Sequence, residues 1–407
     1  MKVLALGGSG DMGRMAVSIL LESPTISYIT VADKNIERVN HFIDIIGSDK
    51  LIPAEIDVTY KDKLQDLIAS HDIVMNTVGP YYKYTTSILD SVIKAKKHYV
   101  DICDDWKPTL DLLEMNEKAK KAEITGIIGI GASPGITNIM AVIACSKLDE
   151  VNDLITAWGT GGAGKVGENP KYYVPARLFY KKYKDMPIIA NAATMHLFYE
   201  TLEDFPIYKD GKFINIKPLT DAEPYQFPGF KDTYVCHIGH PEPVTLPRVL
   251  KVKSVSNLMY MGKGITEIIR KYTQKIRNKE LSVSEASIKF YEELRDQPRT
   301  SENIKEYIGM PPGLSVIAIG TKEGKRKKIA IANEKVPAGG MAGVTGIPLA
   351  ITVEMLVNGE IIEKGVLTPE EAFTDPMGFL DRYAKYCGKN LSGEDVLIIK
   401  EVDLYDL

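Results

Sequence analysis

The sequence predicts an α/β protein organised around a doubly wound parallel sheet at its N-terminus. Three observations carry this prediction. A short apolar run at residues 2–6 leads directly into a glycine-rich turn, apolar strand-like runs alternate with helical patterns over the first 130 residues, and this alternation stops near residue 150. Strands that alternate with helices are joined by crossovers and form a parallel sheet with helices on its faces.

The N-terminal turn has the spacing of a dinucleotide-binding loop. Gly8, Gly10 and Gly13 follow the apolar run in the order G-x-G-x-x-G. The first glycine permits a tight turn, the second lets a pyrophosphate approach the backbone, and the third lets helix and strand pack closely. The next strand, at residues 28–32, ends at Asp33, where a carboxylate would accept hydrogen bonds from ribose hydroxyls. The predicted cofactor contacts in this stretch are Gly8, Ser9, Gly10, Asp11, Met12, Gly13 and Asp33.

Asp33 also bears on the identity of the dinucleotide. A carboxylate at this position accepts a free 2′-hydroxyl and repels a 2′-phosphate, which favours NAD. Lys34 and Arg38 follow closely and would offset that repulsion, although both also fit an ordinary solvated surface. We therefore predict NAD as the cofactor, with NADP as the open alternative.

Later strand ends extend the predicted site along one edge of the sheet. Further strands are expected at residues 51–58, 71–76, 98–102 and 124–130, separated by helical patterns. Ligands of such sheets bind beyond the carboxyl ends of the strands. The additional cofactor contacts expected there are Lys34, Asp57, Val58, Val78, Gly79, Pro80 and Asp101, and the substrate contacts are Tyr81, Tyr82, Cys103 and Ser133.

Length, charge and cysteine usage exclude several classes of protein. A chain of 407 residues suits two or three domains. The net charge of −4 gives no reason to expect a nucleic-acid or membrane partner, and we expect neither a membrane span nor a signal peptide. The four cysteines are far apart and form no C-x-x-C, so we expect no disulfide framework, no metal site and a cytoplasmic location.

The rest of the chain predicts two further parts. Strand-like pieces with turns between them, such as 208–216 and the hairpin arms 314–320 and 328–332, indicate a mainly antiparallel α+β domain. Helical patterns return at 345–359 and 369–386, and we expect them to pack on the first domain. The predicted domains are therefore residues 1–135 for the nucleotide, 136–338 for substrate and dimer contacts, and 339–407 as the returning segment.

These stretches, taken in order, resemble the saccharopine dehydrogenase family. The resemblance rests on residues 7–13 (GGSGDMG), 76–82 (NTVGPYY), 131–138 (GASPGITN), 240–247 (HPEPVTLP) and 345–348 (TGIP). It implies a Rossmann domain made of both chain ends, a central domain that holds the substrate, and a homodimer. Family members are NAD(P)-linked amino-acid oxidoreductases, including saccharopine reductases, lysine 6-dehydrogenase and carboxynorspermidine dehydrogenase. Residues 101–106 (DICDDW) and 133–138 (SPGITN) depart from the best-known members near the expected substrate, where Asn138 is a further predicted contact.

The resemblance implies hydride transfer at a carbon that bears nitrogen, which requires an acid or base that titrates near the working pH. Candidates are Asp104, Asp105, His196 and Lys83, and Arg177 is the candidate partner for a substrate carboxylate. The structural alternatives are a solvated turn or a helix N-cap for the two aspartates, a core position for His196, and surface or interface packing for Arg177.

The sequence therefore predicts an NAD(P)-dependent oxidoreductase that acts on a C–N bond of lysine or a lysine-derived opine-like substrate. Two alternatives stay open. One is a reductase of a C=C or C=O bond in a lipid-like substrate, which would want an apolar pocket. The other is a nucleotide-binding protein without catalysis.

Overall fold

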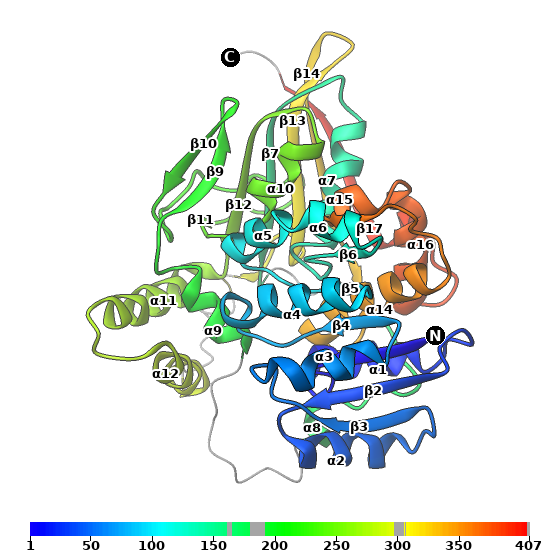
Figure 1. Ribbon diagram of the computed structural model, residues 1–407. Helices are drawn as coiled ribbons and strands as arrows, with labels where there is room; N and C mark the ends of the chain where they lie inside the picture. Colours follow the sequence, from blue (N-terminus) through cyan, green and yellow to red (C-terminus); the bar gives the residue numbers. More distant parts are fainter. Residues whose placement is uncertain (161–164, 180–191, 297–304, 306, 405–407) are drawn as a thin grey trace. The chain divides into compact units, whose positions relative to one another are not determined.

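The computed structural model describes residues 1–160, 165–179, 192–296, 305 and 307–404 (Figure 1). Within these residues the chain divides into two compact units. The first comprises residues 1–136, 165–179 and 335–396, and the second comprises 137–160, 192–296, 305, 307–334 and 397–404. The domain boundaries drawn from the sequence, at 135/136 and 338/339, stay a prediction.

The first unit is built on a parallel sheet, as predicted. Its described strands run in the order β16-β6-β5-β4-β1-β2-β3, and every neighbouring pair is parallel. The order reverses on either side of β1, which pairs with both β2 and β4, so the sheet is doubly wound. The strands are β1 (Lys2–Leu6), β2 (Tyr28–Asp33), β3 (Leu51–Glu55), β4 (Ile73–Asn76), β5 (His98–Asp101), β6 (Thr125–Ile127) and β16 (Gly365–Leu367).

The helices of the first unit begin and end where local chemistry favours it. The Asn35 side chain caps α2 by accepting from the Arg38 N–H, and Gly47 ends this helix at a φ of +64°. These helices are α1 (Asp11–Leu20), α2 (Ile36–Ile46), α3 (Lys61–Ala69), α4 (Tyr81–Ala95), α5 (Trp106–Leu113), α6 (Asn116–Lys121), α8 (Ala176–Phe179), α14 (Met341–Val357), α15 (Pro369–Ala372) and α16 (Pro376–Cys387). The short strands β8 (Lys165–Val166) and β15 (Lys335–Val336) pair in parallel, and η2 (Glu394–Val396) follows α16.

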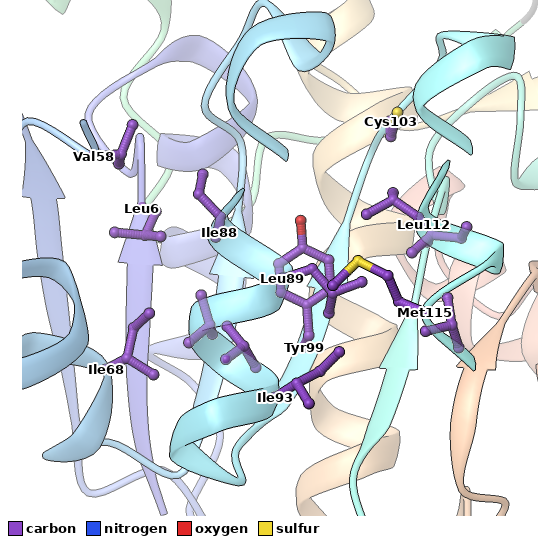
Figure 2. Packing of buried hydrophobic residues seen from close by; sticks show 14 of the residues in the cluster. Leu6, Val58, Ile68, Ile88, Leu89, Ile93, Tyr99, Cys103, Leu112 and Met115 are labelled. Atoms are coloured by element: carbon purple, nitrogen blue, oxygen red, sulfur yellow. The ribbon is translucent and has the colours of Figure 1, made fainter. Parts of the chain in front are cut away.

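One hydrophobic core joins this sheet to the helices that cover it. Figure 2 shows Ile88 and Leu89 of α4 beside Tyr99 of β5, and all three side chains are fully buried. On the other side of β1, α14 lies against α1, where a Cβ on Gly346 would sit 2.7 Å from the Met12 carbonyl oxygen. Residues 341–357 therefore help to hold α1 in place, although they lie more than 300 positions from it in the sequence.

The second unit contains a mixed sheet. Its described strands run β10-β9-β12-β7-β13-β14-β17, with β11 also paired to β12. They are β7 (Glu150–Gly159), β9 (Phe205–Lys209), β10 (Lys212–Ile216), β11 (Cys236–His237), β12 (Val252–Tyr260), β13 (Leu314–Lys322), β14 (Lys325–Asn333) and β17 (Leu397–Asp403). The helices are α7 (Ile136–Ser146), α9 (Ala192–Tyr199), α10 (Glu242–Val249), α11 (Gly262–Arg277) and α12 (Val283–Asp296).

The predicted hairpin with arms at 314–320 and 328–332 is confirmed, and the sheet is mainly antiparallel as expected, with one parallel pair among its described strands. β9 pairs antiparallel with β10, and β13 with β14 (Figure 1, yellow). Each turn has two residues at positive φ, Asp210-Gly211 and Glu323-Gly324, as a two-residue hairpin requires. β7 and β12, in contrast, are parallel, because more than 90 residues separate them and a long connection allows a crossover.

Candidate functional site

The glycine-rich loop at the carboxyl end of β1 is shaped for close backbone approach. Gly7 has a φ of +70° and its N–H donates to the Ala32 carbonyl at 2.8 Å, which ties the loop to β2. A Cβ on Gly13 would lie 2.6 Å from the Gly7 oxygen, so only glycine lets α1 begin this close to the strand. The N–H groups of the first turn of α1 follow directly after this loop, and a helix N-terminus in such a position is suited to bind a pyrophosphate.

The carboxylate of Asp33 is held by two partners from this loop and from α2. Its Oδ2 accepts from Ser9 Oγ at 2.6 Å and from Arg38 Nη2 at 2.9 Å, and Arg38 Nε also donates to Ser9 Oγ at 2.9 Å. The Asp33 side chain is 10% exposed and that of Arg38 is 27% exposed. A guanidinium therefore sits beside the carboxylate that is predicted to accept the ribose hydroxyls, whereas Lys34 is exposed. This arrangement fits either dinucleotide.

A buried arginine that the sequence analysis missed forms hydrogen bonds to residues of the glycine-rich loop. Arg14 is 1% exposed, and its Nη1 donates to the Ser9 carbonyl at 2.8 Å while Nη2 pairs with Asp11 Oδ1 at 2.6 Å. The Phe179 ring of α8 covers the guanidinium, with 3.8 Å between the carbon Cζ and the ring centroid. The available signal was an arginine on the apolar face of a predicted helix, next to Met15 and Ala16.

The next strand ends carry the residues predicted to follow the cofactor toward the substrate. Asp101, at the end of β5, is fully buried, and its oxygens accept from the N–H groups of Cys103 and Gly129 and from the Tyr99 hydroxyl at 2.8–3.0 Å. Burial raises the pKa of the Asp101 carboxyl, and burial also raises the pKa of the Cys103 thiol well above its usual range. Asp101 thus fastens the strand end to the turn at Gly129.

The second unit holds a buried group of imidazoles and carboxylates. His196 Nε2 lies 3.0 Å from Glu200 Oε1, and His240 Nε2 lies 3.4 Å from the same oxygen. His240 Nδ1 lies 2.6 Å from Glu242 Oε2, and Thr137 Oγ1 donates to Glu242 Oε1 at 2.8 Å. The side chains of Glu200 and Glu242 are completely buried. We call His196, Glu200, His240 and Glu242 the His–Glu cluster.

The surroundings of His240 favour its charged form. Burial by itself lowers the pKa of His240, but the Glu242 and Glu200 carboxylates outweigh burial and raise it above its usual value. The Trp158 ring lies against the imidazole, with 5.6 Å between ring centroids, and Trp158 is itself fixed by a hydrogen bond from Nε1 to Asn257 Oδ1 at 3.0 Å. A cluster with two carboxylates and an imidazolium can exchange protons or bind an ammonium group.

Comparison with known families agrees with both units. The model of the saccharopine dehydrogenase NADP binding domain matches residues 3–127, and the model of the saccharopine dehydrogenase C-terminal domain matches residues 131–389. This chain belongs to the saccharopine dehydrogenase family. The predicted family, fold class and NAD(P) cofactor are thereby confirmed, as is the prediction of an NAD(P)-dependent oxidoreductase of the amino-acid type.

Individual relatives of the saccharopine dehydrogenase family are distant in sequence. The chain is 23% identical to saccharopine dehydrogenase [NADP(+), L-glutamate-forming] of Schizosaccharomyces pombe over 86% of its own length and 91% of that protein. It is 22% identical to carboxyaminopropylagmatine dehydrogenase of Synechocystis sp., over 91% and 92% of the two chains. A match to the Pyricularia oryzae saccharopine dehydrogenase is 25% identical and covers 56% of this chain and 47%, about half, of that protein.

A solved structure shows the same fold. Apo saccharopine dehydrogenase (L-Glu forming) from Saccharomyces cerevisiae superposes with a TM-score of 0.61 at 17% identity, over 99% of this chain and all of that chain. At 17% identity this comparison shows that the two proteins share a fold, and it does not identify the substrate of the present chain.

The structure locates the predicted site residues of this saccharopine dehydrogenase family member within the two units. In the first unit Val58 and Cys103 lie in the hydrophobic core (Figure 2), 7% and 0% exposed, which points to packing roles for their side chains. Asp105 is the buried N-cap residue of α5, and Pro80 is the N-cap residue of α4. Ligand contacts by all predicted site residues stay predictions.

The second unit brings His196 into the His–Glu cluster with residues that the sequence analysis did not select. Glu200, His240 and Glu242 lie in two segments more than 35 positions apart, so no spacing rule could join them. The sequence predicts no metal site, but the structure brings His196, Glu200 and His240 together, with ligand atoms within 4.8 Å of one another. The Arg177 side chain lies outside the described residues.

Proposed function

We propose that this chain transfers hydride at a C–N bond of lysine or a lysine-derived opine-like substrate, using NAD(P). The His–Glu cluster is the observation that carries the proposal. It provides buried anionic and titratable groups of the kind that an amine substrate requires. A reductase of a lipid-like C=C or C=O bond would want an apolar site, and a protein without catalysis would not need a buried titratable cluster.

The nicotinamide, when bound, accepts the hydride during oxidation of an amine and supplies it during reduction of an imine. The protein then has to move one proton at the substrate nitrogen, and in the oxidative direction it must also activate a water that attacks the imine carbon. We propose His196 for these proton transfers, because its side chain is 11% exposed while Glu200 beside it is fully buried. Asp104, Asp105 and Lys83 remain candidates for the same task.

Substrate recognition is proposed for the residues that the sequence analysis assigned to it. Tyr81, at the start of α4, is 7% exposed, Ser133 precedes the turn at Gly135, and Asn138 is buried near the start of α7. These three positions support polar contacts to an amino-acid-like ligand. The remaining members of the proposed set are Tyr82, Cys103 and Arg177.

We propose that the cofactor site accepts both NAD(H) and NADP(H). Asp33 can receive the ribose hydroxyls of NAD. Arg38 neutralises that carboxylate and can turn a guanidinium toward a 2′-phosphate, which removes the repulsion that Asp33 alone would impose. The other proposed cofactor contacts are Lys34, Asp57, Val78, Gly79 and Pro80.

A cytoplasmic homodimer is the proposed state of the enzyme. All four cysteines are free thiols and buried, as suits a reducing compartment. In the described part of the chain, no helix is long and apolar enough to cross a membrane. β10 ends the second sheet, with Phe213 55% exposed, and an edge strand of this kind supports pairing with another copy. Light scattering of the purified protein tests the dimer.

Thermal unfolding with ligands tests the proposed function. Each dinucleotide is added alone, and then lysine, saccharopine or glutamate is added to the complex. A ligand that binds only the folded state raises the melting temperature as its concentration exceeds Kd. We expect a rise with both dinucleotides, a further rise with one amino acid, and reduction of NAD(P)+ or oxidation of NAD(P)H with the same compound. Stabilisation by dinucleotide but by no amine or amino acid would contradict the proposed substrate class.

A further inference from the structure

The four members of the His–Glu cluster come from two short segments that the fold of the second unit brings together. His196 lies in the last turns of α9, and Glu200 follows one turn later, its N–H donating to the His196 carbonyl at 3.0 Å. His240 precedes α10, and Glu242 is the first residue of that helix. Positions i and i+4 share one helix face, so His196 and Glu200 meet by local geometry. His240 and Glu242 meet them only through the tertiary fold.

The contacts within the cluster form a linear chain. It runs from Glu242 to His240 at 2.6 Å, from His240 to Glu200 at 3.4 Å, and from Glu200 to His196 at 3.0 Å. The hydroxyl of Thr137 on α7 fixes the Glu242 end at 2.8 Å. Exposure is greatest at the His196 end: the His196 side chain is 11% exposed, His240 is 3% exposed, and Glu200 and Glu242 are 0% exposed. The end that a substrate could reach is therefore His196.

The contacts also fix where charge resides. Both ring nitrogens of His240 lie near carboxylate oxygens, Nδ1 at 2.6 Å from Glu242 and Nε2 at 3.4 Å from Glu200, and these two carboxylates favour the imidazolium form of the ring. That imidazolium balances one of the two buried carboxylates. The Glu200 oxygen that faces His240 also faces Nε2 of His196. A proton that His196 takes up from the substrate would face this second carboxylate.

We propose that Glu200, His240 and Glu242 are positioning residues that hold His196 as the acid/base of the reaction through this buried chain. The inference rests on the proposed function and extends it to three residues outside the predicted site. During amine oxidation the proton leaves the substrate nitrogen and bonds to Nδ1 of His196, whose Nε2 lies 3.0 Å from the Glu200 carboxylate. During imine reduction the same proton returns. A base held by a carboxylate that also stabilises its protonated form is a recurring catalytic arrangement.

The charge arrangement predicts opposite effects for two isosteric substitutions. Glu200→Gln removes the anion beside His196, so the pKa of His196 falls and the acidic limb of kcat/KM moves to lower pH. Glu242→Gln removes a carboxylate that favours the protonated form of His240. With less positive charge on His240, the Glu200 carboxylate is less compensated, so the pKa of His196 rises and the acidic limb of kcat/KM moves to higher pH. We expect each shift to be about one pH unit, given charges separated by one imidazole ring in a buried site. In the second unit, the titratable groups beside His196 include Glu200 and His240.

Two further variants separate this role from general damage to the fold. Glu242→Asp keeps the charge, and we expect it to retain the wild-type pH profile even where kcat falls. His237→Asn changes a neighbouring histidine on β11 outside the cluster and should leave the profile unchanged. Shifts in the same direction for Glu200→Gln and Glu242→Gln, or no shift in either folded variant, would overturn the proposal.

A measurement without substrate keeps this inference distinct from the proposed function. The chain has six histidines, so 15N-labelled imidazole signals can be assigned with His196→Asn and His240→Asn and titrated by NMR. We expect His240 to stay protonated at neutral pH and Glu242→Gln to raise the pKa of His196. If the pKa of His196 were the same in Glu242→Gln as in wild type, the proposed coupling of Glu242 to His196 would be refuted, even if the enzyme oxidised lysine. Stoichiometric metal in the purified protein, lost in His196→Asn, would refute it as well, because the three nitrogen and oxygen atoms would then be ligands.

Discussion

Substitution of Arg38 by alanine is the most direct test of how this protein chooses its dinucleotide. Arg38 donates to Asp33 Oδ2 and to Ser9 Oγ, both at 2.9 Å. Among the described side chains, Arg38 and Ser9 are the two that donate to Oδ2 of Asp33. Without the guanidinium, the Asp33 carboxylate keeps its full negative charge beside the ribose. That charge repels a 2′-phosphate and still accepts a 2′-hydroxyl.

The size of the effect follows from the exposure of the pair. A hydrogen bond to a charged group contributes about 1.5–3 kcal/mol. Arg38 is 27% exposed, so solvent screens the interaction and the lower end, about 1.5–2 kcal/mol, applies. Since 1.4 kcal/mol is a factor of ten, Arg38→Ala should raise the Kd for NADPH about 10- to 30-fold. The Kd for NADH should change less than about threefold, because a free 2′-hydroxyl is expected to hydrogen-bond to Asp33 with or without Arg38.

Calorimetric titration of both reduced dinucleotides into wild type and variant measures this difference. Lys34→Ala is the comparison within the site, and it should have less effect on NADPH because Lys34 is exposed. Lys212→Ala, on β10 of the second unit, makes the same change in net charge elsewhere. An Arg38→Ala protein that loses both dinucleotides equally, or neither, would show that Arg38 does not read the 2′ position.

Two further predictions concern the loop and the pH dependence of stability. Gly13→Ala should abolish stabilisation by dinucleotides and lower the free energy of unfolding by about 1–3 kcal/mol, as measured by denaturant titration. The reason is that the new Cβ would lie only 2.6–2.7 Å from backbone atoms of Gly7 and Gly8. The control is Gly264→Ala on α11, where no atom lies within 4 Å of the added Cβ, and this variant should be as stable as wild type or more stable. His71 is buried with its Nε2 2.7 Å from the Thr30 hydroxyl, and burial lowers its pKa below that of the unfolded chain. The unfolded chain therefore takes up a proton first as pH falls below about 6.5, and stability should decline from there toward the lower folded pKa. In urea titrations at pH 5 and pH 7.5, the free energy of unfolding of His71→Gln should differ less between the two pH values than that of wild type. An equal difference in both proteins would show that His71 does not cause this pH dependence.

The local patterns of the sequence determined the parallel sheet at the start of the first unit, but not the strands that residues 165–166, 335–336 and 365–367 add to that unit. The order of apolar runs, glycines and Asp33 predicted β1 and β2 to within one residue and a helix after the glycines. A parallel strand buried on both faces and a turn that needs glycine both leave a pattern in the sequence. The same holds for the two hairpins, whose Asp-Gly and Glu-Gly turns require positive φ. No local sequence pattern predicted the parallel pairing of β7 with β12, because the two strands are joined by a connection of more than 90 residues.

What only the tertiary structure decided is which polar groups meet. Nothing in the chain near residue 196 indicates His240, and nothing near Asp33 indicates that Arg38 and Ser9 would share one of its oxygens. Arg14 looked like one charge on an apolar helix until Phe179 covered it, from a segment more than 160 positions away. Secondary structure follows from interactions between near neighbours along the chain, so sequence patterns record it. A buried charge is stabilised by whichever partner the fold brings within hydrogen-bond reach, and that partner is fixed only when the whole chain has folded.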